Sequence, residues 1–163
     1  MTVSSNNADE VTRSIEKAGR FALFGLVSLC VVAVTAWAIG AGPNADPPYE
    51  FKQMVDAAKA DTSDARIRES FAIVDREYVW RLRLSPDQLD AVLTDRELPE
   101  SHDLPDNFSA AFPLLWRPVK TKASRFFATE QFPFTSRGPD GDHYAAMYDS
   151  EQQFFYVRFK GNF

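Results

Sequence analysis

An uncharged apolar run near the amino terminus limits most strongly what this chain can form. The run covers residues 21–39, and no charged residue occurs between Arg20 and Asp46. At a helical rise of about 1.5 Å per residue, roughly 20 apolar residues cross the hydrocarbon core of a bilayer. The sequence therefore predicts a transmembrane helix within residues 21–42, preceded by a tail of residues 1–20.

Two other interpretations compete with the transmembrane helix. A cleaved signal peptide usually has an apolar stretch of about 7–15 residues after a short basic start, whereas this longer run follows a tail of twenty residues. Ala36 and Ala38 do form an Ala-x-Ala pattern that a signal peptidase accepts. A buried core helix would need a domain that encloses it on every side. We therefore interpret the run as a signal anchor, which makes the chain a single-pass membrane protein.

The basic residues on each side of the run predict its orientation. Arg13, Lys17 and Arg20 precede the run, whereas Lys52 and Lys59 are the first basic residues after it. Because Lys and Arg close to a span tend to stay in the cytoplasm, we expect a cytoplasmic amino terminus. The chain would then be anchored in the cytoplasmic (inner) membrane, with everything from residue 43 onward outside the cytoplasm.

The segments beside the run have distinct compositions. Residues 1–14 carry almost no apolar side chains and are predicted to be disordered. Residues 43–48 contain three prolines and are predicted to form a stiff linker that ends the membrane helix. The exported domain then covers residues 49–163, which is enough chain for one hydrophobic core.

Hydrophobic periodicity predicts helices and strands in the first half of this domain. Apolar side chains at helical spacing predict a helix over residues 49–60. Residues 65–74 suit a helix face or a strand, but residues 78–84 alternate strictly, which favours two strands joined by a turn at 75–77. Ser85 and Gln88 form a capping box around Pro86, so a helix is predicted over residues 86–96.

The second half of the domain begins with a segment rich in proline. Residues 98–118 contain four prolines and are predicted to be irregular, with one helical turn at 107–112. This segment is too apolar to leave in water, so we expect it to lie over the open face of the sheet; its large apolar residues are Phe108, Phe112, Leu114, Leu115 and Trp116.

Three further strands are predicted, at residues 124–132, 143–148 and 154–159. The expected fold class is therefore α+β: one transmembrane helix, then a small antiparallel sheet of four or five strands with one or two packed helices and a proline-rich covering segment. Aromatic residues such as Phe154 and Phe155 occur on both parities of a strand. This pattern fits a sheet covered on both faces or an exposed aromatic patch for a partner, and we favour the covered sheet.

Charge argues against nucleic acid as a partner. The 18 basic and 23 acidic residues of the chain include three of each before residue 43, so the exported part carries the whole net charge of −5. An acidic domain lacks the electrostatic footprint of a DNA- or RNA-binding protein. The exception is a local basic run, Arg117, Lys120, Lys122 and Arg125. It is either a solvated face or a surface that meets lipid headgroups.

The best candidate for an ion site is the sequence Asp140-Gly141-Asp142-His143. Two carboxylates and an imidazole could ligate a metal, but the further oxygen ligands of a calcium loop are missing. Pro-Asp-Gly is a common turn sequence, so we interpret the segment as a loop and predict no metal. The chain also lacks the Gly-x-Ser-x-Gly elbow, the phosphate-binding loop and the dinucleotide fingerprint. We therefore predict no catalytic residues and no cofactor.

These observations predict a non-enzymatic accessory or interaction module of the cell envelope. Its expected partners are the lipid bilayer, another envelope protein or a second copy of the chain. Ala36 and Gly40 form a small-x-x-x-small pair that permits close helix contact between copies. The alternative is a small ligand-binding or hydrolytic domain tethered to the membrane. Converging polar groups in a concavity would favour this alternative, whereas a flat apolar surface would favour an interaction module.

Overall fold

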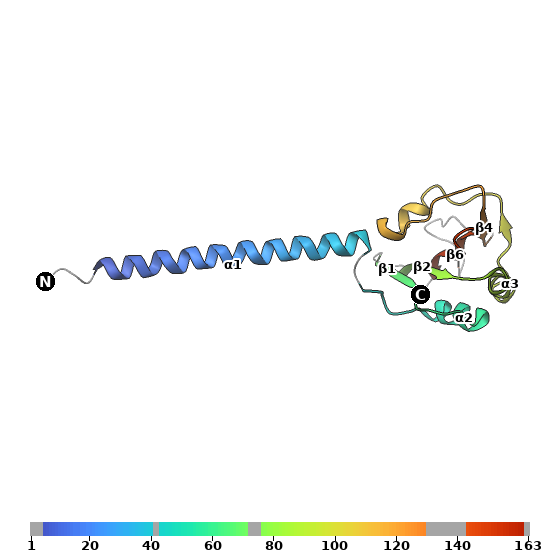
Figure 1. Ribbon diagram of the computed structural model, residues 1–163, viewed down its shortest axis with the longest axis horizontal. Coiled ribbons are helices and arrows are strands. Elements are labelled where there is room, and N and C mark those ends of the chain that lie inside the picture. The colour runs from blue at the N-terminus through green and yellow to red at the C-terminus, as the bar shows by residue number, and fades with distance from the viewer. Residues whose placement is uncertain (1–4, 41–42, 72–75, 130–142, 162–163) are drawn as a thin grey trace. The chain divides into compact units, whose positions relative to one another are not determined.

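The chain divides into two compact units, Met1–Gly42 and Pro43–Phe163. The computed structural model describes residues 5–40, 43–71, 76–129 and 143–161 (Figure 1). Each unit is described by itself below.

The described residues of the first unit, 5–40, form one helix, α1 (Ser5–Ile39). Its segment Ala18–Ala36 has a mean hydropathy of 1.9 and is long and apolar enough to cross a membrane. The side chains of that segment are exposed, with Phe21 at 77%, so the interpretation as a buried core helix is wrong. The length and apolarity fit either a membrane anchor or a signal sequence.

The helix begins earlier than the sequence predicted. Residues 5–14 were expected to be disordered, yet α1 already starts at Ser5. Asp9 and Arg13, and likewise Glu16 and Arg20, are spaced four residues apart with the acid first. This arrangement stabilises a helix even where apolar content is low.

The second unit contains a six-stranded sheet in which every pair of neighbouring strands is antiparallel. The α+β class is confirmed, but the count of four or five strands is wrong. The order across the sheet is β1-β2-β6-β5-β4-β3, and the strands are β1 (Arg66–Phe71), β2 (Arg76–Arg83), β3 (Glu100–Ser101), β4 (Ser124–Ala128), β5 (His143–Asp149) and β6 (Phe154–Gly161).

The additional strand is β3, which the sequence could not reveal. It has only two residues, which pair with Phe127 and Phe126 of β4. A period of two is not visible in so short a strand, and Pro99 and Pro105 on either side favour irregular structure. The predicted turn at 75–77 also shifts, because β2 already includes Arg76 and Glu77.

Two helices cover one face of the sheet. These are α2 (Tyr49–Ala58) and α3 (Pro86–Asp95), as the helical spacing and the capping box predicted. The alternating residues of β2 point toward them, and Trp80, Leu82 and Leu84 are fully buried with Phe51 and Met54 of α2. Leu89 and Val92 of α3 complete this core.

The proline-rich segment covers the opposite face (Figure 1, yellow to orange). Two short 3-10 turns, Ser109–Ala111 and Leu114–Trp116, place Phe108, Phe112 and Trp116 in a second core. Phe112 lies 5.1 Å from Phe108, 5.6 Å from Trp116 and 5.9 Å from Tyr156 of β6, measured between ring centroids. The interpretation of a sheet covered on both faces is therefore confirmed.

The segment 43–48 lies along the edge of the sheet instead of forming a simple spacer. Ala45 donates its N–H to the Ile67 carbonyl at 3.1 Å. The side-chain amide of Asn44 accepts from the Ile67 N–H and donates to the Ala65 carbonyl, each at 3.1 Å. Two of these bonds satisfy the N–H and carbonyl of Ile67, which the edge strand β1 would otherwise leave open, and the third satisfies the carbonyl of Ala65 just before β1.

The capping box of α3 yields a stability prediction. Ser85 Oγ accepts the Gln88 N–H at 3.3 Å, and Gln88 Oε1 accepts the Ser85 N–H at 2.9 Å. Ser85→Ala is expected to lower the free energy of unfolding by about 1 kcal/mol, because it removes the acceptor of the first turn. Urea unfolding of the detergent-solubilised chain measures this loss. Ser85→Asp retains a capping oxygen and is the matched control. An alanine midpoint equal to that of the unmodified chain would contradict the role of the cap.

Candidate functional site

The metal candidates of the sequence are only partly described. Asp140 and Asp142 lie outside the described residues. His143 is the first residue of β5, pairs with Lys160 of β6 and is 1% exposed. It belongs to the sheet and not to an exposed loop. Within the described ranges, no group of three or more His, Cys, Asp or Glu could hold a metal ion.

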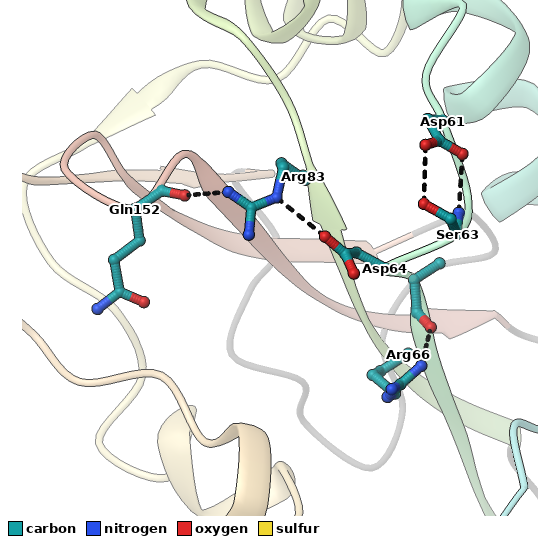
Figure 2. A network of polar contacts seen from close by, with 7 residues as sticks. Asp61, Ser63, Asp64, Arg66, Arg83 and Gln152 are labelled. Carbon is teal, nitrogen blue, oxygen red and sulfur yellow. Dashed lines mark hydrogen bonds and ion pairs between the residues drawn. The ribbon is translucent and has the colours of Figure 1, made fainter.

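A polar concavity of about 210 Å³ lies where the segment before β1 meets the end of β2 (Figure 2). Arg83 lies between two partners: its Nε is 3.1 Å from Asp64 Oδ2, and its Nη1 donates to the Gln152 carbonyl at 3.3 Å. Nearby, the Asp61 carboxylate accepts a hydrogen bond from the backbone N–H of Ser63 at 2.9 Å and another from the Ser63 hydroxyl at 2.7 Å. The network ties the segment before β1 to the loop between β5 and β6.

The electrostatics of this concavity do not favour acid–base catalysis. The backbone N–H of Ser63, and then its hydroxyl, hold the pKa of Asp61 below its ordinary value. Asp61 is therefore ionised at neutral pH, whereas a catalytic acid needs a pKa raised toward the working pH. The Asp64 carboxylate is paired with Arg83 on an exposed surface. We interpret the cluster as a structural connection.

A larger concavity, of about 370 Å³, lies between α2, the segment 44–47 and the start of β1. Its volume falls in the range of sites that take a small molecule or a large side chain. Phe51 and Ile67 are buried in its wall. The apolar residues that line this α2 cavity are Ala45, Pro47, Phe51, Val55, Ala65 and Ile67.

The polar groups of the α2 cavity are few. Lys52 and Asp56 contribute from exposed positions on α2, and Thr62 contributes from the segment before β1. The fourth polar residue, Asn44, already uses its amide to bind the β1 backbone. The cavity therefore presents apolar walls with charges at its margin, and it suits an apolar group.

A third feature is the largely exposed stretch of residues 113–122, which begins in the proline-rich segment and continues just beyond it; we call it the basic strap. Leu114, Leu115 and Val119 are 62%, 63% and 70% exposed. This corrects the expectation that both leucines would cover the sheet. Phe108, Phe112 and Trp116 recur every four residues and take the buried positions, so the two leucines fall on the outer side. That spacing was the signal that sequence reasoning missed.

The cations near the strap differ in their partners. Lys120 Nζ lies 3.3 Å from Asp103 Oδ1, and Arg117 donates to the Phe112 carbonyl at 3.3 Å. Arg125, just beyond the strap, donates to Glu100 at 3.1 and 3.4 Å, and these bonds hold the pKa of Glu100 below its ordinary value.

The α2 cavity leaves no pattern in the sequence, because its walls come from three segments whose side chains each look like ordinary core residues. Comparisons of the chain with protein-family models, with curated proteins and with solved structures found no match.

Proposed function

We propose that this chain is a single-pass membrane protein of the cell envelope whose α+β domain is a non-enzymatic interaction module. Its binding site is the α2 cavity, which takes an apolar side chain of another envelope protein. The observation that supports this function is a ready-formed apolar cavity of about 370 Å³ at the surface of the domain. Interfaces between proteins derive most of their binding energy from a few large side chains that fill such pockets.

The lining of the cavity supports binding more than catalysis. Its charged groups are one ammonium, Lys52, and one carboxylate, Asp56, both at exposed positions on α2. A hydrolytic site needs a nucleophile or activated water, a base within hydrogen-bond reach and donors for the developing charge. Apolar walls supply none of these groups, but they do release free energy when they are covered by another apolar surface.

The membrane anchor in this proposal is the apolar segment of α1. With Arg13, Lys17 and Arg20 on its amino side, the amino terminus stays in the cytoplasm and the domain lies outside it, at the cytoplasmic membrane. Pairing of copies through α1 is the weaker alternative. Thr35 donates its hydroxyl to the Val31 carbonyl of the same helix at 2.8 Å, so this donor is not available to a neighbouring helix.

Site-specific photocrosslinking in intact cells tests the cavity. Val55, which lines the cavity on α2, is replaced by p-benzoylphenylalanine, and exposed Asp90 on α3 is the matched control. We expect one discrete protein adduct from position 55 and none from position 90. Adding Thr62→Trp, which places a large ring at the margin of the cavity, should reduce the adduct by about tenfold, the effect of losing one well-filled pocket.

The outcomes separate interaction from the alternative of ligand binding. Equal adducts from positions 55 and 90, or an adduct that Thr62→Trp leaves unchanged, would contradict the cavity as the binding site. A small molecule that copurifies with the chain, is seen by native mass spectrometry and is lost in Thr62→Trp, without any protein adduct, would establish the ligand-binding alternative instead. Binding of a small molecule is the second candidate function because the volume of the α2 cavity is sufficient for one.

A further inference from the structure

The basic strap combines neighbouring exposed apolar side chains with a run of cations. We propose that the strap docks on an anionic lipid bilayer, with Leu114, Leu115 and Val119 entering the headgroup region and the cations binding lipid phosphates. This inference rests on the membrane anchor of the proposed function but not on the α2 cavity, and it concerns a different face of the domain.

The apolar side chains of the strap are held outward by the fold. Phe112, Pro113, Trp116 and Pro118 are buried, whereas the residues between and after them point into solvent. Two of the four buried residues are prolines, which fix their own backbone angle. The strap therefore cannot withdraw its leucines without giving up the second core. A surface that is rigid before binding loses little conformational entropy when it binds.

The charge of the strap complements an anionic bilayer. No acidic residue occurs from Asn107 to Thr129, a stretch that contains Arg117, Lys120, Lys122 and Arg125. The domain that contains this stretch carries a net charge of −5, so the strap is a locally basic region of an acidic domain. Clusters of Lys and Arg beside a membrane are attracted to anionic lipids.

Two neighbouring carboxylates only partly offset this charge. Asp103 pairs with Lys120 and Glu100 pairs with Arg125, and all four side chains are at least 44% exposed. Exposed ion pairs contribute little free energy, so a lipid phosphate can replace these carboxylates at small cost. Arg117 and Lys122 form no ion pair with any carboxylate in the described part of the chain.

A bilayer fits the strap better than nucleic acid or a soluble protein does. Leucine and valine among Lys and Arg are typical of segments that lie in the membrane interface, whereas contacts to nucleic acid are mostly polar. In the proposed function α1 lies in the bilayer, and the polypeptide chain joins α1 to the domain. The effective concentration of the bilayer at the strap therefore exceeds that of any free partner, and weak docking is sufficient.

The experiment uses the full chain in nanodiscs with a fluorescent reporter on the strap. Cys30, the one cysteine of the chain, is replaced by Ala, and Leu115→Cys is labelled with an NBD dye. In the matched control, exposed Glu151, in the loop between β5 and β6, is replaced by cysteine (Glu151→Cys) and labelled in the same way. In nanodiscs of phosphatidylcholine with phosphatidylglycerol, we expect the emission of the dye at position 115 to shift to the blue and to be quenched by nitroxide lipids. The dye at position 151 should show neither change. Phosphatidylcholine alone, or 0.5 M salt, should abolish both signals.

A charge variant separates the contribution of the cations to membrane binding from that of the apolar side chains. The triple substitution Arg117→Gln, Lys120→Gln and Lys122→Gln keeps the leucines and removes three charges from exposed positions. In this triple variant, we expect quenching by nitroxide lipids to be nearly the same in anionic and in neutral nanodiscs. The near-UV circular dichroism spectrum should be unchanged. Retained quenching in this variant would overturn the proposed role of the cations.

Two other results would overturn the proposal itself. One is a dye at position 115 that stays in water in anionic nanodiscs, or that shifts no more than the dye at position 151. The other is a blue shift at 115 that occurs equally in detergent and increases with protein concentration, since this would identify a second copy of the chain as the occupant. Neither result bears on the crosslinking from Val55, so docking of the strap and binding in the α2 cavity fail independently.

Discussion

Replacing Trp80 by alanine is expected to lower the free energy of unfolding by about 3–5 kcal/mol, the usual cost of truncating a large core aromatic. Trp80 is 0% exposed and lies in β2 between Ile67 of β1 and Val157 of β6. Its ring is 6.0 Å from the rings of Phe51 and Phe159. Domains of this size are commonly stable by about 5–15 kcal/mol. One substitution should therefore remove a large share of the stability.

The matched control for this prediction is Trp80→Phe. The indole N–H of Trp80 has no hydrogen-bond acceptor among the described residues. Phenylalanine retains an aromatic ring and removes that buried donor, whose desolvation is a cost in the folded state. We expect less than half the loss seen with alanine. Urea unfolding followed by far-UV circular dichroism measures both variants. Equal losses would show that packing of the ring is not the source of the effect.

The second large expected effect is the activity of a reporter that depends on membrane insertion of the apolar segment of α1, Ala18–Ala36. This activity should be either fully present or absent. A reporter enzyme that is active only outside the cytoplasm, fused after residue 163, should be active. The fusion should also keep its full size and stay in the membrane after carbonate washing. The physical reason is the cost of moving Arg13, Lys17 and Arg20 across the bilayer during insertion, which holds the amino terminus inside.

A charge-reversal variant is the control for this orientation. Replacing Arg13, Lys17 and Arg20 by Gln and changing exposed Asp46 to Lys moves the positive charge to the other side of the segment. We expect the activity of the reporter to fall. An inactive reporter on the unmodified chain would contradict the proposed orientation. Release of a shortened soluble product would show instead that the segment is a cleaved signal.

The sequence predicts those parts of the fold that depend on short-range chemistry. Ser85, Pro86 and Gln88 specify the start of α3 because a cap is formed by residues within three positions of one another. The alternation along β2 likewise specifies which side chains face α2 and α3. In both cases the structure agrees with the prediction because no distant residue needs to be known.

Features that depend on distant contacts escape prediction. The two residues of β3 become a strand only because β4 lies beside them. The α2 cavity forms only where three segments that are distant in the sequence come together. The buried position of His143 depends on its pairing with Lys160 of β6. Composition alone specifies none of these partners.

Tension along the chain from α1 would reach the domain at the edge of its sheet. Asn44 and Ala45 form two hydrogen bonds with Ile67 of β1 and one with Ala65 just before it, so a pull on the residues before them is transmitted to those bonds first. Behind them, β1 is paired along its six residues with β2. A load at this point is shared between these three bonds and the packing of Ala45 against the core beneath α2 and α3. The contacts of Asn44 and Ala45 therefore hold the amino-terminal end of the domain to its sheet under load.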